Sequence, residues 1–259
     1  MKIKSYYMFF FVFIIGFFII YFYNNQIFLA INGFLPDIMG YPMLLLTSLA
    51  DGFFVLMFLS LYYPYRKSKY TTALISLIVT GAIIQLIKNY IPMPRPLKVF
   101  DAEDIFILGL KIKTKSFPSG HSAAAMVLTV YLTQIKDINY KIFYFILGIL
   151  ACISRVYIGV HFPIDIWVGG WMGFSFTYFL YYINNKNKLN LLNKISKKEN
   201  KIFIDITGIT IILVYLFFYT EKTKQLEFIL TPLVILLFFY FFYRIYINYK
   251  EVVFNGKIK

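Results

Sequence analysis

Eight apolar runs, most of them close to 20 residues long, constrain the fold of this 259-residue chain more than any other feature. An α-helix needs about 20 apolar residues to cross the hydrocarbon core of a bilayer, whereas a transmembrane β-barrel shows alternating segments of about ten. The runs therefore predict an all-α, polytopic membrane helix bundle. They lie at about 6–23, 41–63, 71–90, 120–135, 142–160, 162–183, 203–219 and 228–247.

The composition supports a membrane protein and bears on its partners. Hydrophobic residues make up 60% of the chain and charged residues only 15%, against about 25% charged residues in a soluble domain. A net charge of +14 would suggest nucleic acid as the partner of a soluble protein. In a membrane protein, such a charge is better explained by topology and by attraction to anionic lipids. We therefore expect membrane lipids and no nucleic acid as partners, and leave the oligomeric state open.

The distribution of positive charge predicts the topology. Most of the 26 lysines and arginines fall in the N-terminus, in alternate loops and in the C-terminal tail, whereas loop 24–40 has none. Because cytoplasmic loops of membrane proteins carry an excess of Lys and Arg, we expect both termini in the cytoplasm. A bias towards Lys, Asn and Ile indicates a bacterium, so we expect a multi-pass protein of its cytoplasmic (inner) membrane.

The runs also divide the chain into three parts. Residues 1–183 form a six-span catalytic core, residues 184–202 a basic cytoplasmic loop, and residues 203–259 two additional spans with a cytoplasmic tail. We expect packing, dimerisation or partner docking from the last two spans. Gly169 and Gly173 in the sixth run form a GxxxG pattern, which is weak evidence for a close helix contact.

A polar island at residues 115–122 opens the fourth run. Pro118 cannot continue a preceding helix and Ser119 is a favourable N-cap, so a helix is predicted to begin here. The N–H groups of a first turn and the helix dipole favour a bound anion. Gly120 would let a ligand approach, and His121 supplies a titratable group. Taken alone, the stretch is typical of an ordinary helix cap.

Charged residues before and after this island point to one common site. Lys88 and Arg95 precede it, and Arg155, His161 and Asp165 follow it. Lys88 ends the third run, Arg155 closes the fifth and His161 opens the sixth. Since alternate ends of successive spans face the same side, we expect these residues to meet the island at the non-cytoplasmic surface.

The residue types favour an anionic ligand and a histidine nucleophile. A single cation near a span end usually reaches to the interface. Three cations beside few external acids favour a phosphate instead, because arginine matches its oxygens and lysine adds a point charge. His161 and Asp165 are four residues apart, so Asp165 can hold one ring nitrogen and leave the other as a nucleophile. A helix-capping role is the alternative for Asp165. The external acids are Asp37, Asp51 and those at 101–104, too few to suggest a metal pair.

The order and spacing of these residues resemble the three signature motifs of the type-2 phosphatidic acid phosphatase superfamily. The residues that carry the resemblance are Lys88 with Arg95-Pro96, then Pro118-Ser119-Gly120-His121, then Ser154-Arg155 with His161 and Asp165. The resemblance implies that His161 attacks phosphorus, with Asp165 beside it, and that His121 protonates the leaving oxygen and then activates water. It implies that the phosphate is held by Lys88, Arg95, Ser119, Gly120 and Arg155. No metal or cofactor is expected.

The expected function is therefore an integral membrane phosphatase acting on a lipid phosphate or diphosphate at the periplasmic or outer face. Undecaprenyl diphosphate is the first expected substrate, followed by the phosphates of lipid A or phosphatidylglycerol phosphate. The same residues would also suit a lipid-to-lipid phosphotransferase of this superfamily or a phospholipid-binding transporter. Residues 97–117 are expected to form an interfacial amphipathic element beside the site or a loop held against the bundle.

Overall fold

The computed structural model describes residues 3–62, 67–109, 111–135, 138–185, 208–210, 212 and 227–256. Every regular element in this part of the chain is a helix, which confirms the all-α prediction. The helices with given bounds are α1 (Ile3–Phe22), α2 (Asn24–Ile31), α3 (Pro36–Leu49), α4 (Gly52–Tyr62), α5 (Lys67–Tyr90), α6 (Pro96–Val99), α7 (Gly120–Ile135), α8 (Ile138–Tyr157), α9 (Pro163–Asn185) and α12 (Glu227–Gly256).

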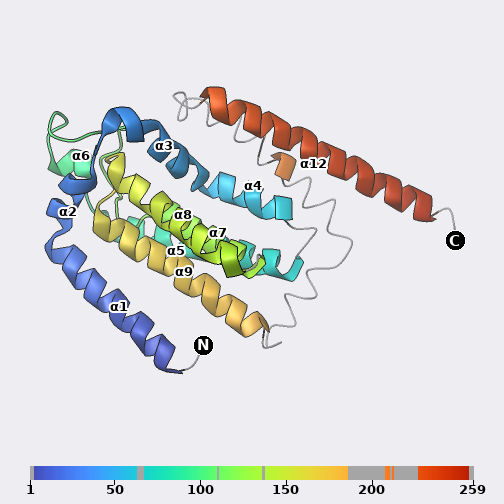
Figure 1. Cartoon of the computed structure of the whole chain (residues 1–259), viewed down its shortest axis with the longest axis horizontal. Helices are drawn as coiled ribbons and strands as arrows, with labels where there is room; N and C mark the ends of the chain where they lie inside the picture. Colours follow the sequence, from blue (N-terminus) through green and yellow to red (C-terminus); the bar gives the residue numbers. More distant parts are fainter. Residues whose placement is uncertain are drawn as a thin grey trace.

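Helix α7 lies at the centre of the bundle, where it packs against α4, α5, α8 and α9 (Figure 1). Two glycines of α9 bring its backbone against the first turns of α7. A Cβ atom at Gly169 would lie 2.3 Å from the carbonyl oxygen of Ser119, and one at Gly173 would lie 2.2 Å from that of Ala123. The GxxxG pattern therefore marks a backbone-to-backbone contact, and this contact sets the start of α9 beside the start of α7.

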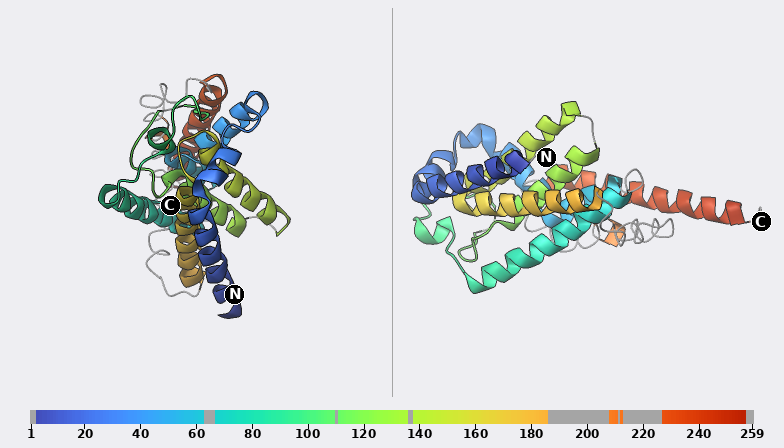
Figure 2. Two further views of the ribbon diagram at one scale, coloured as in Figure 1. Left: turned by 90° about the vertical axis from the view of Figure 1, so that its left-hand side faces the viewer. Right: turned by 90° about the horizontal axis from the view of Figure 1, so that it is seen from below.

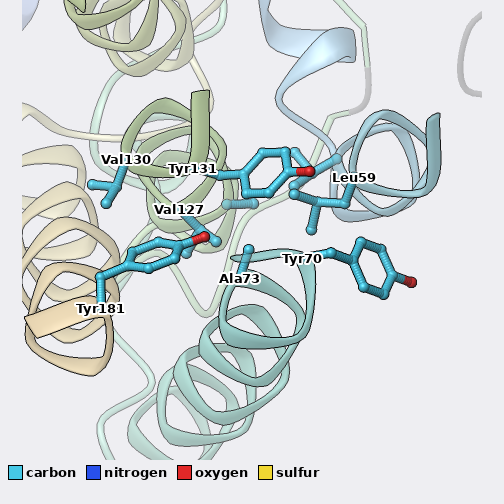
Figure 3. Packing of buried hydrophobic residues seen from close by; sticks show 9 residues of the cluster. Leu59, Tyr70, Ala73, Val127, Val130, Tyr131 and Tyr181 are labelled. Carbon is cyan, nitrogen blue, oxygen red and sulfur yellow. The ribbon is translucent and has the colours of Figure 1, made fainter. Parts of the chain in front are cut away.

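A second region of tight packing joins α4, α5, α7 and α9 towards their other ends. Figure 3 shows its buried side chains, with Tyr131 of α7 beside Leu59 of α4 and Tyr181 of α9 beside Val127. The Tyr181 hydroxyl donates to the carbonyl oxygen of Lys69 at 2.6 Å, so its polar end is satisfied. Packing at this end and the glycine contact at the other hold α7 and α9 in one relative position.

The helices have the apolar surfaces of a membrane protein. Aromatic side chains such as Phe10, Phe11 and Phe18 of α1 are more than half exposed, as expected of groups that face lipid. Within the described residues, Lys69–Tyr90 and Tyr140–Tyr157 are each long and apolar enough to cross a membrane. Two bent pairs, α1 with α2 and α3 with α4, would raise the number of spans to four. Eight spans remain a prediction.

The apolar run 41–63 does not form the one straight helix that was expected. It divides into the second half of α3 and all of α4, which are bent by 65° at Ala50 and Asp51. The carboxylate of Asp51 accepts the N–H of Phe53 at 3.0 Å, so a new helix starts at the break. The segment 24–40, expected as a loop, contains α2 and the start of α3.

The described residues of 97–117, all except residue 110, form a loop held against the bundle, the second of the two expectations; among them only the single turn of α6 is helical. Asn32, which follows α2, fastens this loop. Its side-chain amide donates to the carbonyl oxygens of Phe106 and Tyr157, each at 2.9 Å, and its oxygen accepts the Phe106 N–H at 2.8 Å. Phe106 stacks edge-on against Tyr157 at the end of α8.

The predicted run 228–247 lies within α12, which packs on α3 and α4 through Val234 and Phe241. Arg244 of α12 donates to the carbonyl oxygen of Ser60 in α4 at 3.1 Å and is buried. The far end of α12 extends beyond the other helices (Figure 2). The predicted loop 184–202, apart from its first two residues, and most of the run 203–219 lie outside the described residues.

Candidate active site

The structure places the predicted site residues together at one end of the bundle. Helix α5 ends there, α7 begins there, and the turn between α8 and α9 lies there (Figure 1). Lys88, Arg95, His121 and Arg155 are all close enough to His161 to act on it electrostatically. Three stretches of chain that are far apart in sequence therefore share one site.

His161 lies in the turn before α9, and Gly159 shapes this turn with a φ of 76°, which favours glycine. The imidazole is 2% exposed, and its Nδ1 lies 3.2 Å from Oδ2 of Asp165. The same oxygen accepts the N–H of Phe162 at 2.8 Å. Asp165 thus caps the start of α9 and contacts the imidazole, so the two roles predicted for it occur together.

A further donor comes from Ser116, whose hydroxyl donates to Oδ2 of Asp165. Ser116 is fully buried, and its oxygen also lies 3.4 Å from Nδ1 of His161. The carboxylate is therefore held from two sides. With the carboxylate at Nδ1, that nitrogen carries the proton of the neutral ring and Nε2 keeps its lone pair.

The surroundings of His161 favour this neutral form. Burial lowers the pKa of His161 well below its usual value, and the positive charges of Arg95, Arg155 and Lys88 lower it further. Desolvation penalises the charged form of a histidine, and like charges nearby add to the penalty. At neutral pH the ring is accordingly uncharged, which is the state that a nitrogen nucleophile requires.

The two cations of the first motif are held by backbone carbonyl groups. Lys88 Nζ donates to the carbonyl oxygens of Lys115 at 2.6 Å and Ser116 at 3.1 Å. Arg95 Nη1 donates to the carbonyl oxygen of Val160 at 3.0 Å. An ammonium has three donors and a guanidinium five, so both groups keep N–H capacity for an anion while their positions are fixed.

Ser119 and Gly120 open helix α7 as the sequence predicts. The Ser119 hydroxyl oxygen accepts the N–H of Ser122 at 3.3 Å, which makes Ser119 the N-cap. The Ser119 N–H donates to the carbonyl oxygen of Asp165 at 3.0 Å and is therefore already used. At Gly120 the nearest atom to an added Cβ would be Ile84 Cγ2 at 3.9 Å, so packing leaves room at this position. The first-turn N–H groups have no acceptor within the helix.

Sequence reasoning missed the contributions of α3 and of the break that follows it. Arg155 Nη1 donates to Oγ1 of Thr47 at 2.7 Å, and His121 Nε2 lies 3.1 Å from Oδ2 of Asp51. Asp51 was counted only among the external acids, and no role was assigned to Thr47. The signal was present, because Asp51 is the only charged residue in run 41–63, and an ionisable residue inside an apolar run commonly marks a functional position.

The fold and the site together define a class of protein: an all-α membrane bundle with two histidines and three cations at one end. Residues 69–189 match the family model of the PAP2 superfamily. The matched segment contains all the predicted site residues from Lys88 to Asp165.

The chain is also similar to individual proteins. Over 115 residues the chain is 30% identical to an undecaprenyl-diphosphatase of Sulfolobus acidocaldarius, an alignment that covers 42% of this chain and 52% of the relative. The chain thus matches about half the length of that protein. The crystal structure of Aquifex aeolicus LpxE superposes with a TM-score of 0.57 at 23% identity, covering 61% of this chain and 94% of LpxE. The first transmembrane PAP2 type phosphatidylglycerolphosphate phosphatase from Bacillus subtilis gives a TM-score of 0.52 at 24% identity, covering 68% and 94%. These two likenesses show the fold.

Proposed function

We propose that the protein is an integral membrane phosphatase that hydrolyses a lipid phosphate or diphosphate through a phosphohistidine. The observation that carries the proposal is the environment of His161. This imidazole is buried, is contacted at Nδ1 by Asp165, and is surrounded by the charges of Arg95, Arg155 and Lys88. A neutral nucleophile inside a ring of cations suits an anionic electrophile.

In the first half-reaction, Nε2 of His161 attacks phosphorus, and the bond between phosphorus and the leaving oxygen breaks. His121 donates a proton to that oxygen. Asp165 stabilises the positive charge that develops on the His161 ring through its contact with Nδ1. In the second half-reaction, His121 takes a proton from water as the water oxygen attacks phosphorus. The bond between nitrogen and phosphorus then breaks, and inorganic phosphate leaves.

The phosphate oxygens are proposed to bind Lys88, Arg95, Arg155, the hydroxyl of Ser119 and the N–H of Gly120. Such catalysis depends mostly on positioning and on charge stabilisation. Because side-chain cations and a helix N-terminus supply both, we propose that the reaction needs no metal. The proposal predicts full phosphate release by purified protein in excess chelator.

For the substrate we propose undecaprenyl diphosphate, and the name of the Sulfolobus relative supports this choice. Lipid A phosphates and phosphatidylglycerol phosphate are the next candidates for the same site. We propose that the site opens at the non-cytoplasmic face of the inner membrane. The excess of lysine and arginine in the N-terminus, the alternate loops and the C-terminal tail supports this orientation.

Phosphate release from a panel of these lipids in detergent tests the proposal, with His161→Ala and His121→Ala as negative controls of unchanged thermal stability. Loss of turnover in both variants is expected. Turnover that survives His161→Ala would refute the phosphohistidine. Release only after addition of a second lipid would identify a phosphotransferase. Lipid binding without turnover, lost in Arg155→Gln but not in His161→Ala, would identify a binding or transport protein.

A further inference from the structure

We propose that Asp51 is a positioning residue for His121, so that the site contains a second His–Asp pair beside His161 and Asp165. Oδ2 of Asp51 lies 3.1 Å from Nε2 of His121, and the Asp51 side chain is 8% exposed. The inference rests on the proposed function, since it assigns Asp51 to the histidine that moves protons.

The break between α3 and α4 is what delivers this carboxylate. Asp51 stands at the 65° bend, and its Oδ1 accepts the N–H of Phe53 at 3.0 Å, which caps α4. Its carbonyl oxygen accepts the N–H of Val55 at 2.9 Å in the same first turn. The helix start therefore fixes one carboxylate oxygen, and the geometry of the group aims the other at His121. The Asp51 side chain thus caps the helix that starts after the break and also contacts His121.

The two histidines contact their carboxylates through opposite ring nitrogens. His161 faces Asp165 with Nδ1, whereas His121 faces Asp51 with Nε2. Nε2 of His161 is thus the nucleophile, and Nδ1 of His121 is the nitrogen left to exchange a proton with the leaving oxygen and then with water. In the first step the proton passes from Nδ1 to oxygen as the bond from oxygen to phosphorus breaks. In the second step Nδ1 takes a proton from the attacking water.

The proton donor needs a carboxylate beside it because its ring must be positively charged when it acts. His121 must carry an extra proton when the leaving oxygen departs. A carboxylate 3.1 Å from its Nε2 stabilises the protonated ring, because opposite charges at this distance attract. His161 adds no charge while it is neutral. Removing the negative charge of Asp51 should therefore impair proton donation more than phosphate binding.

The variant Asp51→Asn separates this role from helix capping, because Asn is as good an N-cap as Asp and retains an oxygen acceptor. The assay is phosphate release from a short-chain alkyl phosphate and from p-nitrophenyl phosphate. The alkyl ester has a strongly basic leaving oxygen that needs a proton, whereas p-nitrophenolate leaves almost unaided. We compare kcat/KM, which reports only the steps up to departure of the leaving oxygen and so excludes the later attack of water, in which His121 also acts. We expect kcat/KM for the alkyl ester to fall about 10- to 100-fold, part of the usual contribution of general acid catalysis. For the aryl ester kcat/KM changes much less.

Asp37→Asn is the matched control, since Asp37 is an exposed acid in the first turn of α3. Asp37→Asn should leave the turnover of both esters unchanged, and thermal unfolding should show that both variants are folded. An equal loss of kcat/KM on the two esters in Asp51→Asn would mean a purely structural role and would overturn the proposal. Unchanged turnover of the alkyl ester would overturn it as well.

A spectroscopic readout keeps this inference separate from the proposed function. The chain has only two histidines, so histidine labelled with carbon-13 gives two ring signals, which His161→Ala assigns. Asp51→Asn should shift the His121 signal and its titration while leaving those of His161 in place. If wild-type protein releases no phosphate from any lipid of the panel or from either ester, the proposed function fails, and the spectrum alone decides whether Asp51 contacts His121. A His121 signal that does not respond to Asp51→Asn refutes the contact.

Discussion

The contact between α7 and α9 can be tested at Gly173, where one added methyl group meets backbone. A Cβ atom at this position would lie 2.2 Å from the carbonyl oxygen of Ala123 and 2.8 Å from its Cα. A normal contact needs at least about 3.2 Å, so the two helices would have to separate by about 1 Å. Neither backbone can rotate out of the way, in contrast to the end of a flexible side chain. Overpacking of this kind costs about 1–3 kcal/mol.

The same displacement affects the site, because α9 carries Asp165 and follows His161, whereas α7 carries His121. A misplacement of about 1 Å between reacting groups costs roughly 100-fold in rate. We therefore expect Gly173→Ala to lower the unfolding temperature and to reduce kcat by about 10- to 100-fold. Thermal unfolding in detergent and phosphate release measure the two effects.

Gly170 supplies the matched control on the same helix. An added Cβ there would lie 3.5 Å from Cγ of Met126 and 3.6 Å from Sγ of Cys152, which are ordinary contacts. Gly170→Ala should be neutral or slightly stabilising, because alanine favours a helix over glycine by about 1 kcal/mol. If Gly173→Ala has the same unfolding temperature and the same kcat as Gly170→Ala, the close backbone contact does not exist, and the site is not positioned by it.

Three further outcomes are expected. His161 should titrate below pH 6.5 in the labelled-histidine spectrum, because burial lowers its pKa in the folded protein. As pH falls, the unfolded chain takes up this proton first, so the folded state loses stability from about pH 6.5 downwards. A titration midpoint at or above pH 6.5 would contradict the burial argument. Asn32→Ala should lower the free energy of unfolding by about 1–3 kcal/mol and expose the loop around Phe106 to protease, since it removes the hydrogen bonds to Phe106 at 2.9 and 2.8 Å. An unchanged cleavage pattern would mean that Asn32 does not hold the loop. Arg95→Lys should reduce kcat/KM at least about 10-fold, because a lysine cannot replace a guanidinium that donates from three nitrogens; wild-type turnover would exclude Arg95 from phosphate binding.

Features that depend on near neighbours in the chain were readable in advance. The apolar runs indicated helices and a membrane, Ser119 was recognised as an N-cap, and the spacing of His161 and Asp165 indicated a pair. Each rests on interactions within about one helical turn, where sequence distance and spatial distance agree. The topology of alternating span ends then predicted that the charged residues would share one end.

What only the tertiary structure decided is which distant groups meet, and where an apolar run breaks. The run 41–63 has the composition of one helix, and its division at Asp51 becomes apparent only when the carboxylate is seen between Phe53 and His121. Ser116 likewise gains its meaning from Asp165, 49 residues away. Residues far apart in a chain are brought together by the packing of whole helices, and no local pattern encodes that packing. The sequence by itself predicted which groups would carry the chemistry, and the helix contacts determined how each of these groups is held.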